Sequence, residues 1–377
     1  MFFYFAASAI MFPYLTIYLS QSCQAYEIGI LMSVIPAAMM VLQPFWGWAA
    51  DRTGIRRILV ITLAVTCVSA IGFIFVKTFF GFFIVISFYA IFVASISSLM
   101  DSLILSIKSD KYGSIRLWGT IGYGVGAFLG GLFKSQLLGF WSFIIHITLL
   151  AATFVFIWMT SDTKGSYNAP KAERERFFDR FSFVKNYKFI ILMISLFLTG
   201  SMIKGYDNFF AVGLCNLKIP GIVLGSVWII AMIPEIIMFR CLDKVVKKIS
   251  PWIILVSGTV LYATRMLFLG FFPVLWVWVI TQPIIGFAYG LWYFGAITLV
   301  KELVGEKQQA TGQTVFWAVS YGAGGLFGSN LSGILVSFIG IYAFFRISTL
   351  VCFTSACIVA VLAYRINKKR NALSAKI

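Results

Sequence analysis

Long apolar stretches alternate with short polar connections along most of the chain. Each stretch is close to the ~20 apolar residues that cross a bilayer as a helix. Helices are required there because lipid offers no hydrogen-bond partner to an open backbone. We therefore predict an all-α membrane protein with twelve transmembrane helices. The predicted spans are 2–20, 27–50, 56–76, 80–107, 113–134, 140–160, 189–212, 221–241, 251–271, 273–299, 311–338 and 340–366.

The two halves of the chain repeat weakly, at one constant offset between the fifth and eleventh helices. The offset equals one half of the protein, which favours two pseudo-repeated six-helix halves with a site between them, near mid-membrane. The matched pairs are Gly113 with Gly312, Trp118 with Trp317, Gly126 with Gly325 and Phe128 with Phe327. The predicted parts are an N-terminal bundle (1–160), a cytoplasmic linker (161–188), a C-terminal bundle (189–366) and a cytoplasmic tail (367–377).

Composition and charge support the membrane interpretation. The 377 residues are 60% hydrophobic and 11% charged, which excludes an ordinary water-soluble protein. The net charge of +17 suggests a nucleic-acid partner, but 24 of the 30 Lys and Arg residues lie in alternate connections and the tail. This is the positive-inside pattern. It predicts a multi-pass protein of the cell (plasma or inner) membrane, with both termini cytoplasmic and no nucleic acid bound.

Cysteine and histidine give no sign of a metal site or cofactor. The six Cys residues lie mostly in apolar stretches, which is typical of packing residues, and no Cys/His metal spacing is present. His146 is the only histidine. Inside an apolar helix, we expect it to be a packed structural residue rather than a proton carrier. The first apolar stretch has no basic region before it and no cleavage site, so no cleavable signal peptide is expected.

Two charged residues flank the turn between the fourth and fifth helices. Asp101 and Arg116 lie in stretches that otherwise read as bilayer-spanning, where a charge costs a few kcal/mol unless it is paired or faces a wet cavity. We expect the two to lie near one another, as a salt bridge that locks two helices or as a pair in a substrate path. The other charges within spans are Lys204, Asp207, Glu235, Arg265 and Arg346.

The fifth helix also carries a stripe of glycines, at spacings of three and four residues. Such a stripe lets a neighbouring backbone pack closely. The glycines are Gly119, Gly122, Gly126 and Gly130.

The connection between the second and third helices carries a recognisable motif. Residues 47–57 read Gly-Trp-Ala-Ala-Asp-Arg-Thr-Gly-Ile-Arg-Arg. This stretch resembles the signature loop of the major facilitator superfamily (MFS), G-x-x-x-D-R-x-G-x-R-R. The resemblance implies that the acid of this loop meets the N-terminal end of helix 11, which favours an anion. The implied conformational lock consists of Gly47, Asp51, Arg52, Gly54 and Arg56.

Within the superfamily, the chain resembles the branch that holds the lactose permease and related sugar and nucleoside proton symporters. Phe2-Phe-Tyr-Phe5, Phe12-Pro-Tyr14 and Gln43-Pro-Phe-Trp-Gly47 carry this resemblance. It implies the MFS fold and alternating access. It also implies substrate binding by Asp101, Arg116, Tyr123 and Glu235, and proton coupling by Glu235, Arg265 and Asp207.

The tenth helix departs from that permease, because it has no charged residue and no histidine. Its polar residues include Thr281, Gln282, Tyr289 and Tyr293. The lactose mechanism therefore does not transfer whole. Glu235 and Arg265 remain either a proton-exchanging pair or a fixed strut. Lys204 and Asp207, three residues apart on one helix, either serve function or neutralise each other.

The resemblance implies a secondary active transporter for a small polar solute (sugar, glycoside or nucleoside), working by proton symport as a monomer in the lipid bilayer. One alternative is an MFS exporter of drugs or metabolites by proton antiport, although the fifth helix lacks the proline of the Gly-Pro pair usual in exporters. Another is a non-transporting membrane receptor. We do not expect an enzyme, because we find no metal cluster, nucleophile–base pair or phosphate loop in the sequence.

Overall fold

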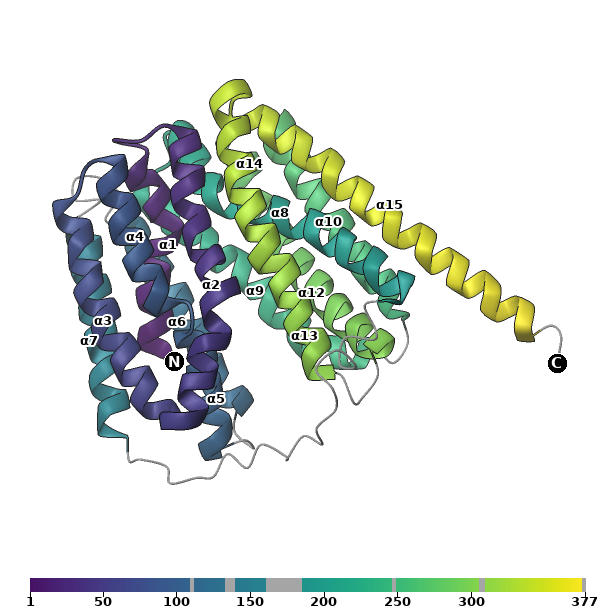
Figure 1. The fold of residues 1–377 in the computed structure, drawn as a ribbon. Helices are drawn as coiled ribbons and strands as arrows, with labels where there is room; N and C mark the ends of the chain where they lie inside the picture. The colour runs from purple at the N-terminus through teal and green to yellow at the C-terminus, as the bar shows by residue number, and fades with distance from the viewer. Residues whose placement is uncertain (109–111, 133–139, 161–184, 246–248, 305–308, 375–377) are drawn as a thin grey trace. The chain divides into compact units, whose positions relative to one another are not determined.

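The structure is a computed structural model that describes residues 1–108, 112–132, 140–160, 185–245, 249–304 and 309–374. All regular elements of these residues are helices (Figure 1). They are α1 (Phe2–Leu19), α2 (Ala25–Thr53), α3 (Ile55–Phe75), α4 (Phe79–Val93), α5 (Ile96–Lys108), α6 (Tyr112–Leu132), α7 (Phe140–Met159), α8 (Tyr187–Asn216), α9 (Gly221–Val245), α10 (Pro251–Phe271), α11 (Leu275–Ile280), α12 (Pro283–Val304), α13 (Gln309–Trp317), the π-helical turn η5 (Ala318–Ala323), α14 (Gly324–Ile339) and α15 (Ile341–Ser374).

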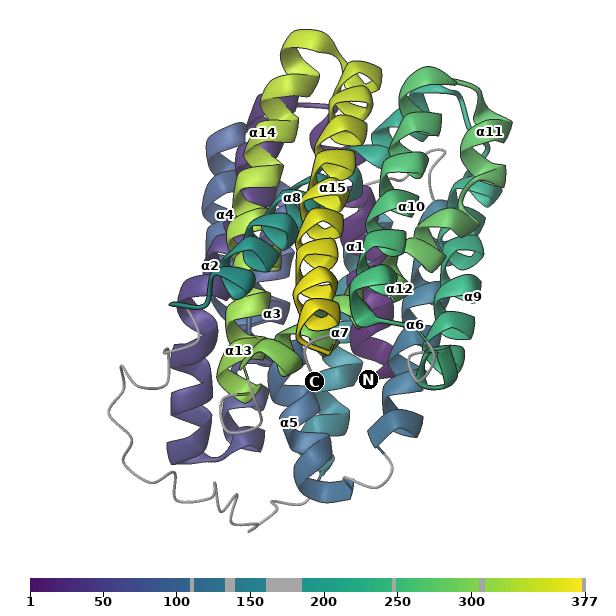
Figure 2. The same cartoon turned by 90° about the vertical axis from the view of Figure 1, so that its right-hand side faces the viewer.

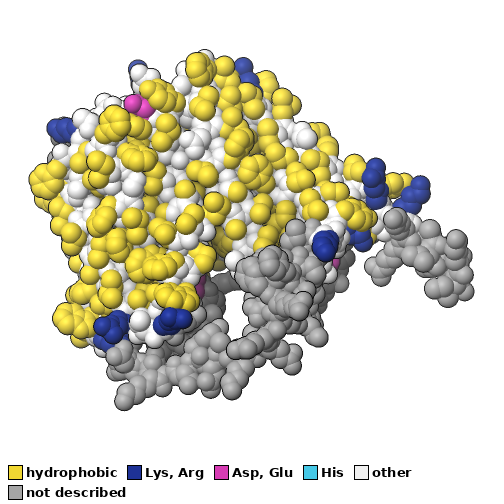
Figure 3. Space-filling model, viewed as in Figure 1, with side chains coloured by type: hydrophobic (Ala, Val, Ile, Leu, Met, Phe, Trp, Pro, Cys, Tyr) yellow, Lys and Arg dark blue, Asp and Glu magenta, His cyan; other side chains and the backbone are white. Residues whose placement is uncertain are grey.

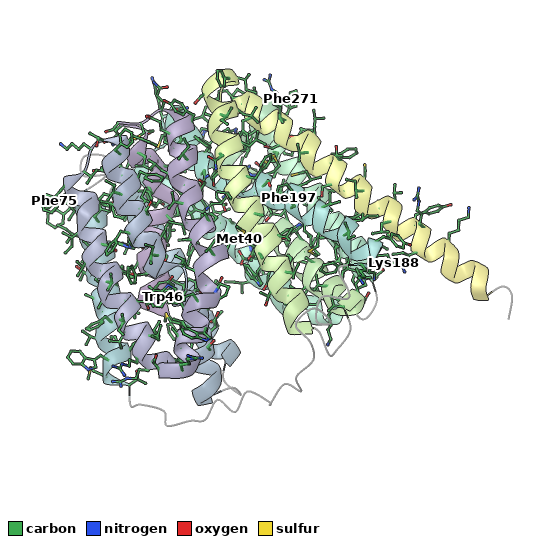
Figure 4. The ribbon with its side chains drawn as sticks, in the orientation of Figure 1. Met40, Trp46, Phe75, Lys188, Phe197 and Phe271 are labelled. Carbon is green, nitrogen blue, oxygen red and sulfur yellow. The ribbon has the colours of Figure 1, made fainter. Side chains whose placement is uncertain are left out.

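Eleven helical segments of the described residues are long and apolar enough to cross a membrane, and α6 adds a shorter apolar stretch, Leu117–Leu132. Hydrophobic side chains cover the visible outer faces of the helices, and Lys and Arg gather near helix ends (Figure 3). Phe75 points outward at the end of α3 and is 78% exposed (Figure 4). Such surfaces suit lipid rather than water. The predicted all-α membrane fold is confirmed.

The predicted span 80–107 corresponds to one membrane-spanning segment, Phe79–Ile104, but its helix is interrupted. The structure divides it into α4 and α5, with a break at Ala94 and Ser95. The hydroxyl of Ser98 donates to the carbonyl oxygen of Ser95 at 2.9 Å. Serine side chains compete in this way with the helical backbone pattern, so a serine-rich stretch favours an interruption.

Two further predicted spans are also interrupted. Residues 273–299 form α11 and α12, which are separated at Thr281 and Gln282. Pro283 explains this break, because proline lacks a backbone N–H and disfavours helical geometry in the residue before it. Residues 311–338 contain the wider π-helical turn η5 between α13 and α14. That turn leads into a glycine-rich stretch with weak preference for a regular α-helix.

The chain divides into two compact units. Unit 1 consists of Met1–Lys171 and Asp207–Ile229, and unit 2 consists of Ala172–Tyr206 and Ile230–Ile377. Both α8 and α9 therefore contribute to each unit. The simpler division into bundles 1–160 and 189–366 stays a prediction.

Within unit 1, α1 lies against α6 and α7. A Cβ atom at Gly122 would overlap the backbone of Phe2, and one at Gly126 would overlap the backbone of Ala6. The close backbone approach predicted from the glycine stripe is confirmed at these positions. On the outer side of the same unit, the Trp46 indole of α2 donates to the carbonyl oxygen of Ile91 at 2.7 Å, which joins α2 to α4 (Figure 4).

Within unit 2, α10 packs against α12 and α15, and Figure 2 shows α10 and α15 side by side. Two glycines allow the contact with α12. Gly258 of α10 meets the backbone of Trp292, and Gly295 of α12 meets the backbone of Leu255. The backbones of α10 and α12 therefore approach as closely as side chains permit, which holds the two helices in a fixed register.

Candidate functional site

The signature loop forms a tight link between α2 and α3. Gly54 has φ 101° and ψ 133°, a conformation that other residues rarely adopt. Arg56 lies in the first turn of α3, and its guanidinium donates to the carbonyl oxygens of Ile157 (3.3 Å) and Trp158. These carbonyls belong to the last turn of α7, where the helix dipole favours a cation. The motif thus fastens the start of α3 to the end of α7.

The structure describes contacts for some of the other predicted lock residues, but not for Asp51. The guanidinium of Arg52 stacks over the Trp48 ring at 4.3 Å from its centroid. Gly47 is half-buried in α2 and has open space where a Cβ would stand. The side chain of Asp51 lies outside the described part of the structure. Its contact with the eleventh predicted membrane helix (311–338) stays a prediction.

The predicted substrate residues of unit 1 lie on α5 and α6. Asp101 is half-buried on α5 and interacts electrostatically with Tyr4 of α1. Tyr123 is half-buried on α6 and lies near Tyr14 of α1, whose hydroxyl donates to the Ala127 carbonyl oxygen at 2.5 Å. The sequence analysis missed these two tyrosines of α1, because only tertiary packing brings them near residues of α5 and α6.

Arg116 is described only as a residue of the α6 helix, and its side chain lies outside the described part of the structure. Its pairing with Asp101 therefore stays a prediction.

His146 is a fully buried cross-link within unit 1. Its Nδ1 lies 2.8 Å from the carbonyl oxygen of Ala7, and its Nε2 lies 3.2 Å from the hydroxyl of Tyr89. A carbonyl only accepts, so Nδ1 carries the proton and the Tyr89 hydroxyl donates to Nε2. Both ring nitrogens are engaged with protein groups that join α7 to α1 and α4. This arrangement agrees with the predicted structural role.

Arg265 is 0% exposed inside α10, which is the most buried position of any predicted site charge with a described side chain. Its guanidinium donates to the hydroxyl of Thr281, to the carbonyl oxygen of Trp278 at 2.9 Å and to Oε1 of Gln282 at 2.6 Å. The hydroxyl of Tyr206 reaches Gln282 at 3.4–3.5 Å. We call this group the arginine cage (Tyr206, Arg265, Trp278, Thr281 and Gln282).

The arginine cage lies at the break between α11 and α12. Gln282 donates its amide to Val279, so the Trp278 carbonyl at the end of α11 takes its hydrogen bond from Arg265 instead. A cation at a helix C-terminus is stabilised both by these carbonyls and by the dipole. Arg265 therefore caps the short α11 helix from a neighbouring helix.

The remaining predicted charges lie on α8 and α9. Glu235 is half-buried on α9, next to the helix-internal Pro234. Gly286 of α12 packs on the α9 backbone at Ala231 and Glu235. On α8, Lys204 is half-buried and Asp207 is exposed. The structure thus places Glu235 beside α12, the helix that directly follows Thr281 and Gln282 of the arginine cage.

Unit 2 also contains an aromatic group that the sequence analysis did not single out as a site. Tyr289 and Tyr293 stack on α12 with centroids 5.7 Å apart and an interplanar angle of 13°. Trp317 lies 5.9 Å from Tyr293 and 4.4 Å from Tyr321 of η5. The hydroxyl of Tyr321 donates to that of Tyr289 at 3.3 Å. We call these four residues the ring cluster (Tyr289, Tyr293, Trp317 and Tyr321).

Comparison with known proteins places this geometry in context. The family model described as the MFS_1 like family matches residues 1–347. The uncharacterized transporter YwbF of Bacillus subtilis (strain 168) is 27% identical over 352 residues, which cover 90% of this chain and 86% of that protein. The maltose permease of Geobacillus stearothermophilus is 26% identical over 360 residues, which cover 92% of this chain and 89% of that protein. The sucrose permease of Escherichia coli is 24% identical over 352 residues, which cover 86% of this chain and 82% of that protein.

Two solved structures share the fold. The nucleoside transporter NupG superposes with a TM-score of 0.80 at 18% sequence identity, over 97% of this chain and 95% of that chain. A bacterial homolog of the human lysosomal transporter Spinster superposes with a TM-score of 0.71 at 14% identity, over 96% of this chain and 93% of that chain. At these identities, the likeness shows the fold alone.

Proposed function

Because the chain belongs to the MFS_1 like family, whose relatives here are small-solute transporters, we propose that it moves a sugar, glycoside or nucleoside by alternating access and proton symport. The observation that carries the proposal is the family match over residues 1–347, together with relatives named maltose permease and sucrose permease. These relatives are permeases and transporters, not enzymes, as the sequence analysis expected.

On the solute side, the proposal assigns binding to Asp101, Arg116 and Tyr123. A guanidinium presents a rigid fork of N–H donors that suits paired hydroxyls or a carboxylate. Asp101 accepts from a solute hydroxyl and orients Arg116, and the Tyr123 ring stacks on the solute. The tyrosines that lie near Asp101 and Tyr123 support this assignment, because they add hydroxyl groups to the same region of unit 1.

For proton coupling, the proposal assigns Glu235 as the residue that binds and releases the proton and Arg265 as the cation that controls this release. Asp207 is the next candidate for the proton-binding residue. A carboxyl group in apolar surroundings holds its proton, and an approaching cation favours proton release. In the arginine cage, Arg265 donates to the Trp278 carbonyl and to Gln282, at a helix break beside the α12 segment on which the α9 backbone at Glu235 packs. Release of the cage would free the guanidinium to approach the carboxylate.

The charge distribution supports the rest of the proposal. Lys and Arg residues in alternate connections and the tail favour a multi-pass protein of the cell membrane with both termini in the cytoplasm. The proposal takes the protein to act as a monomer, with a small-molecule solute and protons as its partners.

The test is uptake of labelled maltose, sucrose and uridine into membrane vesicles under an imposed inward proton gradient. Accumulation that a protonophore collapses is expected, and Arg116→Lys should abolish it because the fork is lost while the charge is kept. Loss of gradient-driven uptake in Glu235→Gln would support the proton assignment. If that variant instead accumulates solute normally, Glu235 is not the carrier and Asp207 takes its place.

The exporter alternative has a distinct signature in the same vesicles. Faster exit of a preloaded solute under an opposing proton gradient, with no accumulation of any test solute, would replace symport by antiport. A receptor would move no solute in either direction.

A further inference from the structure

A cavity of about 280 Å³ lies between α1, α5 and α7 of unit 1. Among the described residues that line it, Thr153 is the only one with a polar side chain, and its hydroxyl already donates to the carbonyl oxygen of Leu149 at 2.9 Å. The wall is therefore apolar. The lining residues used below are Phe2 and Phe3 of α1, Met100 of α5, and Thr153, Phe156 and Ile157 of α7.

The cavity connects the surface of the bundle with its interior. Phe156 is 60% exposed, whereas Met100 is only 2% exposed. The ring of Phe3 stacks on that of Phe156 with centroids 5.4 Å apart and an interplanar angle of 11°. These two rings form the outer part of the wall. A molecule that enters beside Phe156 reaches Met100 by passing through the cavity.

The size and the wall of the cavity favour a slender apolar occupant. At about 30 Å³ for each water-sized group, the cavity has room for roughly nine such groups, which suits a segment of an acyl chain. Buried water would need two to four polar partners, and this wall does not supply them. An empty cavity would leave the lining side chains without partners for dispersion attraction. An apolar chain restores those contacts.

The beginning of α3 supplies positive charge at the edge of the cavity. Arg56 donates to the carbonyl oxygen of Ile157 at 3.3 Å, and Ile157 lines the cavity. Arg57 follows it in the chain and is half-buried. In the same last turn of α7, Trp158 is 60% exposed, and exposed tryptophan rings favour the headgroup level of a membrane. The cavity edge therefore lies close to where lipid headgroups begin.

Arg57 lies on the lipid-facing side of α3. At about 100° per residue, Arg57, Ile61, Val68 and Phe75 fall within about 40° of one another around the helix. The last three are 42%, 65% and 78% exposed, and Phe75 points outward (Figure 4). The rise from Arg57 to Phe75 is about 27 Å, close to the ~30 Å of the hydrocarbon core. Arg57 is therefore placed at the level of lipid phosphates.

We propose that this cavity and Arg57 form a binding site for one anionic phospholipid, which we call the lipid site (Phe3, Arg57, Met100, Thr153 and Phe156). One acyl chain enters beside Phe156 and ends against Met100 and Thr153. The guanidinium of Arg57 binds the phosphate, whose oxygens match its fork of donors. A headgroup with net negative charge is preferred to a zwitterionic one, whose own cation competes with the arginine. The inference does not depend on which solute the protein moves.

The test uses the purified full chain in lipid nanodiscs that contain a phosphatidylglycerol with a photoreactive diazirine in one acyl chain. Parallel nanodiscs contain a phosphatidylcholine with the same chain. After illumination, mass spectrometry locates the labelled residues. Met100 is the reporter, because its burial keeps it out of reach of bulk lipid. Phosphatidylglycerol should label it about fivefold more strongly than phosphatidylcholine, as expected for one added charge contact at the membrane surface.

Two pairs of variants test the two parts of the site. Thr153→Leu places a larger side chain in the cavity and should reduce labelling of Met100 about tenfold or more, because the acyl chain loses its space. Thr148→Leu is the matched control and should stay within about twofold. Thr148 is exposed on the same helix, and its hydroxyl donates in the same way, to the Ile144 carbonyl oxygen at 2.8 Å.

Arg57→Gln should lower labelling by phosphatidylglycerol to the level of phosphatidylcholine. Its control is Lys77→Gln, which removes an exposed cation beyond the other end of α3 and should leave the preference unchanged. Thermal stability and monodispersity of each variant separate a lost site from a lost fold. The Arg57→Gln result tests the proposal even if Thr153→Leu is unstable.

Each contrary outcome overturns a stated part of the inference. If neither lipid labels Met100 above the level seen in Thr153→Leu, no acyl chain enters the cavity and the lipid site is refuted. If both lipids label it equally, or if Arg57→Gln keeps the preference for phosphatidylglycerol, the assignment of an anionic lipid is wrong. None of these results alters the vesicle uptake experiment, so the transport proposal stands or falls separately.

Discussion

Replacement of Arg265 by lysine should loosen the break between α11 and α12 although the positive charge is kept. The guanidinium of Arg265 holds three acceptors from this segment, which are the Thr281 hydroxyl, the Trp278 carbonyl and Gln282 Oε1. A lysine ammonium is a point donor and cannot match the fork. At best it reaches one of these groups.

The magnitude follows from the two acceptors that lysine leaves behind. A buried acceptor without a partner costs about 1–3 kcal/mol, and part of this cost is recovered by local relaxation. Loss of two such bonds therefore gives about 2–4 kcal/mol less stability for the local fold around residues 278–285. The free energy of opening that segment should fall by this amount, so its amides should exchange about 30-fold faster or more.

Native-state hydrogen exchange in nanodiscs measures this effect directly. The amides of Thr281, Gln282, Ile284 and Ile285 report it, since each bonds to a carbonyl of the same broken segment. Arg346→Lys is the control, because Arg346 is exposed and bonds only to the Gly270 carbonyl and the Phe271 ring among the contacts described. Its effect should stay below about 1 kcal/mol.

One result would refute the reasoning about the cage. If Arg265→Lys and Arg346→Lys both leave these four amides within about threefold of the unmodified protein, the guanidinium does not hold the break. Arg265 would then be a buried charge whose role lies elsewhere in the transport cycle.

Three further predictions concern unit 1. Gly126→Leu should block the approach of α6 to α1 and abolish the folded, monodisperse protein, whereas Gly47→Ala, which meets open space, should leave yield and thermal stability unchanged. Arg56→Gln should remove the cation that holds the last carbonyls of α7 and increase protease or exchange sensitivity there, with a loss of about 1–2 kcal/mol; unchanged exchange would contradict it. Burial, followed by the nearby Glu27 carboxylate, raises the pKa of the Cys23 thiol between α1 and α2. In a variant that keeps Cys23 as its single cysteine, maleimide labelling should therefore be slow at pH 7 and accelerate at a higher pH than for a model thiol, and a normal pH profile would contradict this prediction.

The membrane spans could be predicted from the sequence because hydropathy and charge are local properties. The glycine stripe of α6 could be interpreted for the same reason, since its spacing already defines one helix face. The break at Thr281 and Gln282 had a signal in Pro283, but hydropathy alone runs straight through it. The break at Ala94 and the turn η5 depend on small local competitions between serine or glycine and the helical backbone, which hydropathy does not report.

The candidate site was harder to predict because its contacts join helices that are far apart in the chain. The polar residues of the tenth helix were visible in the sequence, yet nothing local indicates that Arg265 bonds to Thr281 and Gln282. In the same way, the hydroxyls of Tyr289 and Tyr321 meet only because tertiary packing brings η5 beside α12. A charge inside a span marks a residue as important, but its partner is chosen by tertiary packing.

The length of α15 has a practical consequence for imaging. Its 34 residues give a rod of about 50 Å at 1.5 Å per residue, whereas the hydrocarbon core is about 30 Å thick. The apolar part of this helix is Ile341–Ile366, and the helix continues without interruption to Ser374. A rigid helical protein fused in register at this end would share the axis of α15 and extend into the solvent. Such a fusion offers a fiducial for aligning single particles of this membrane protein.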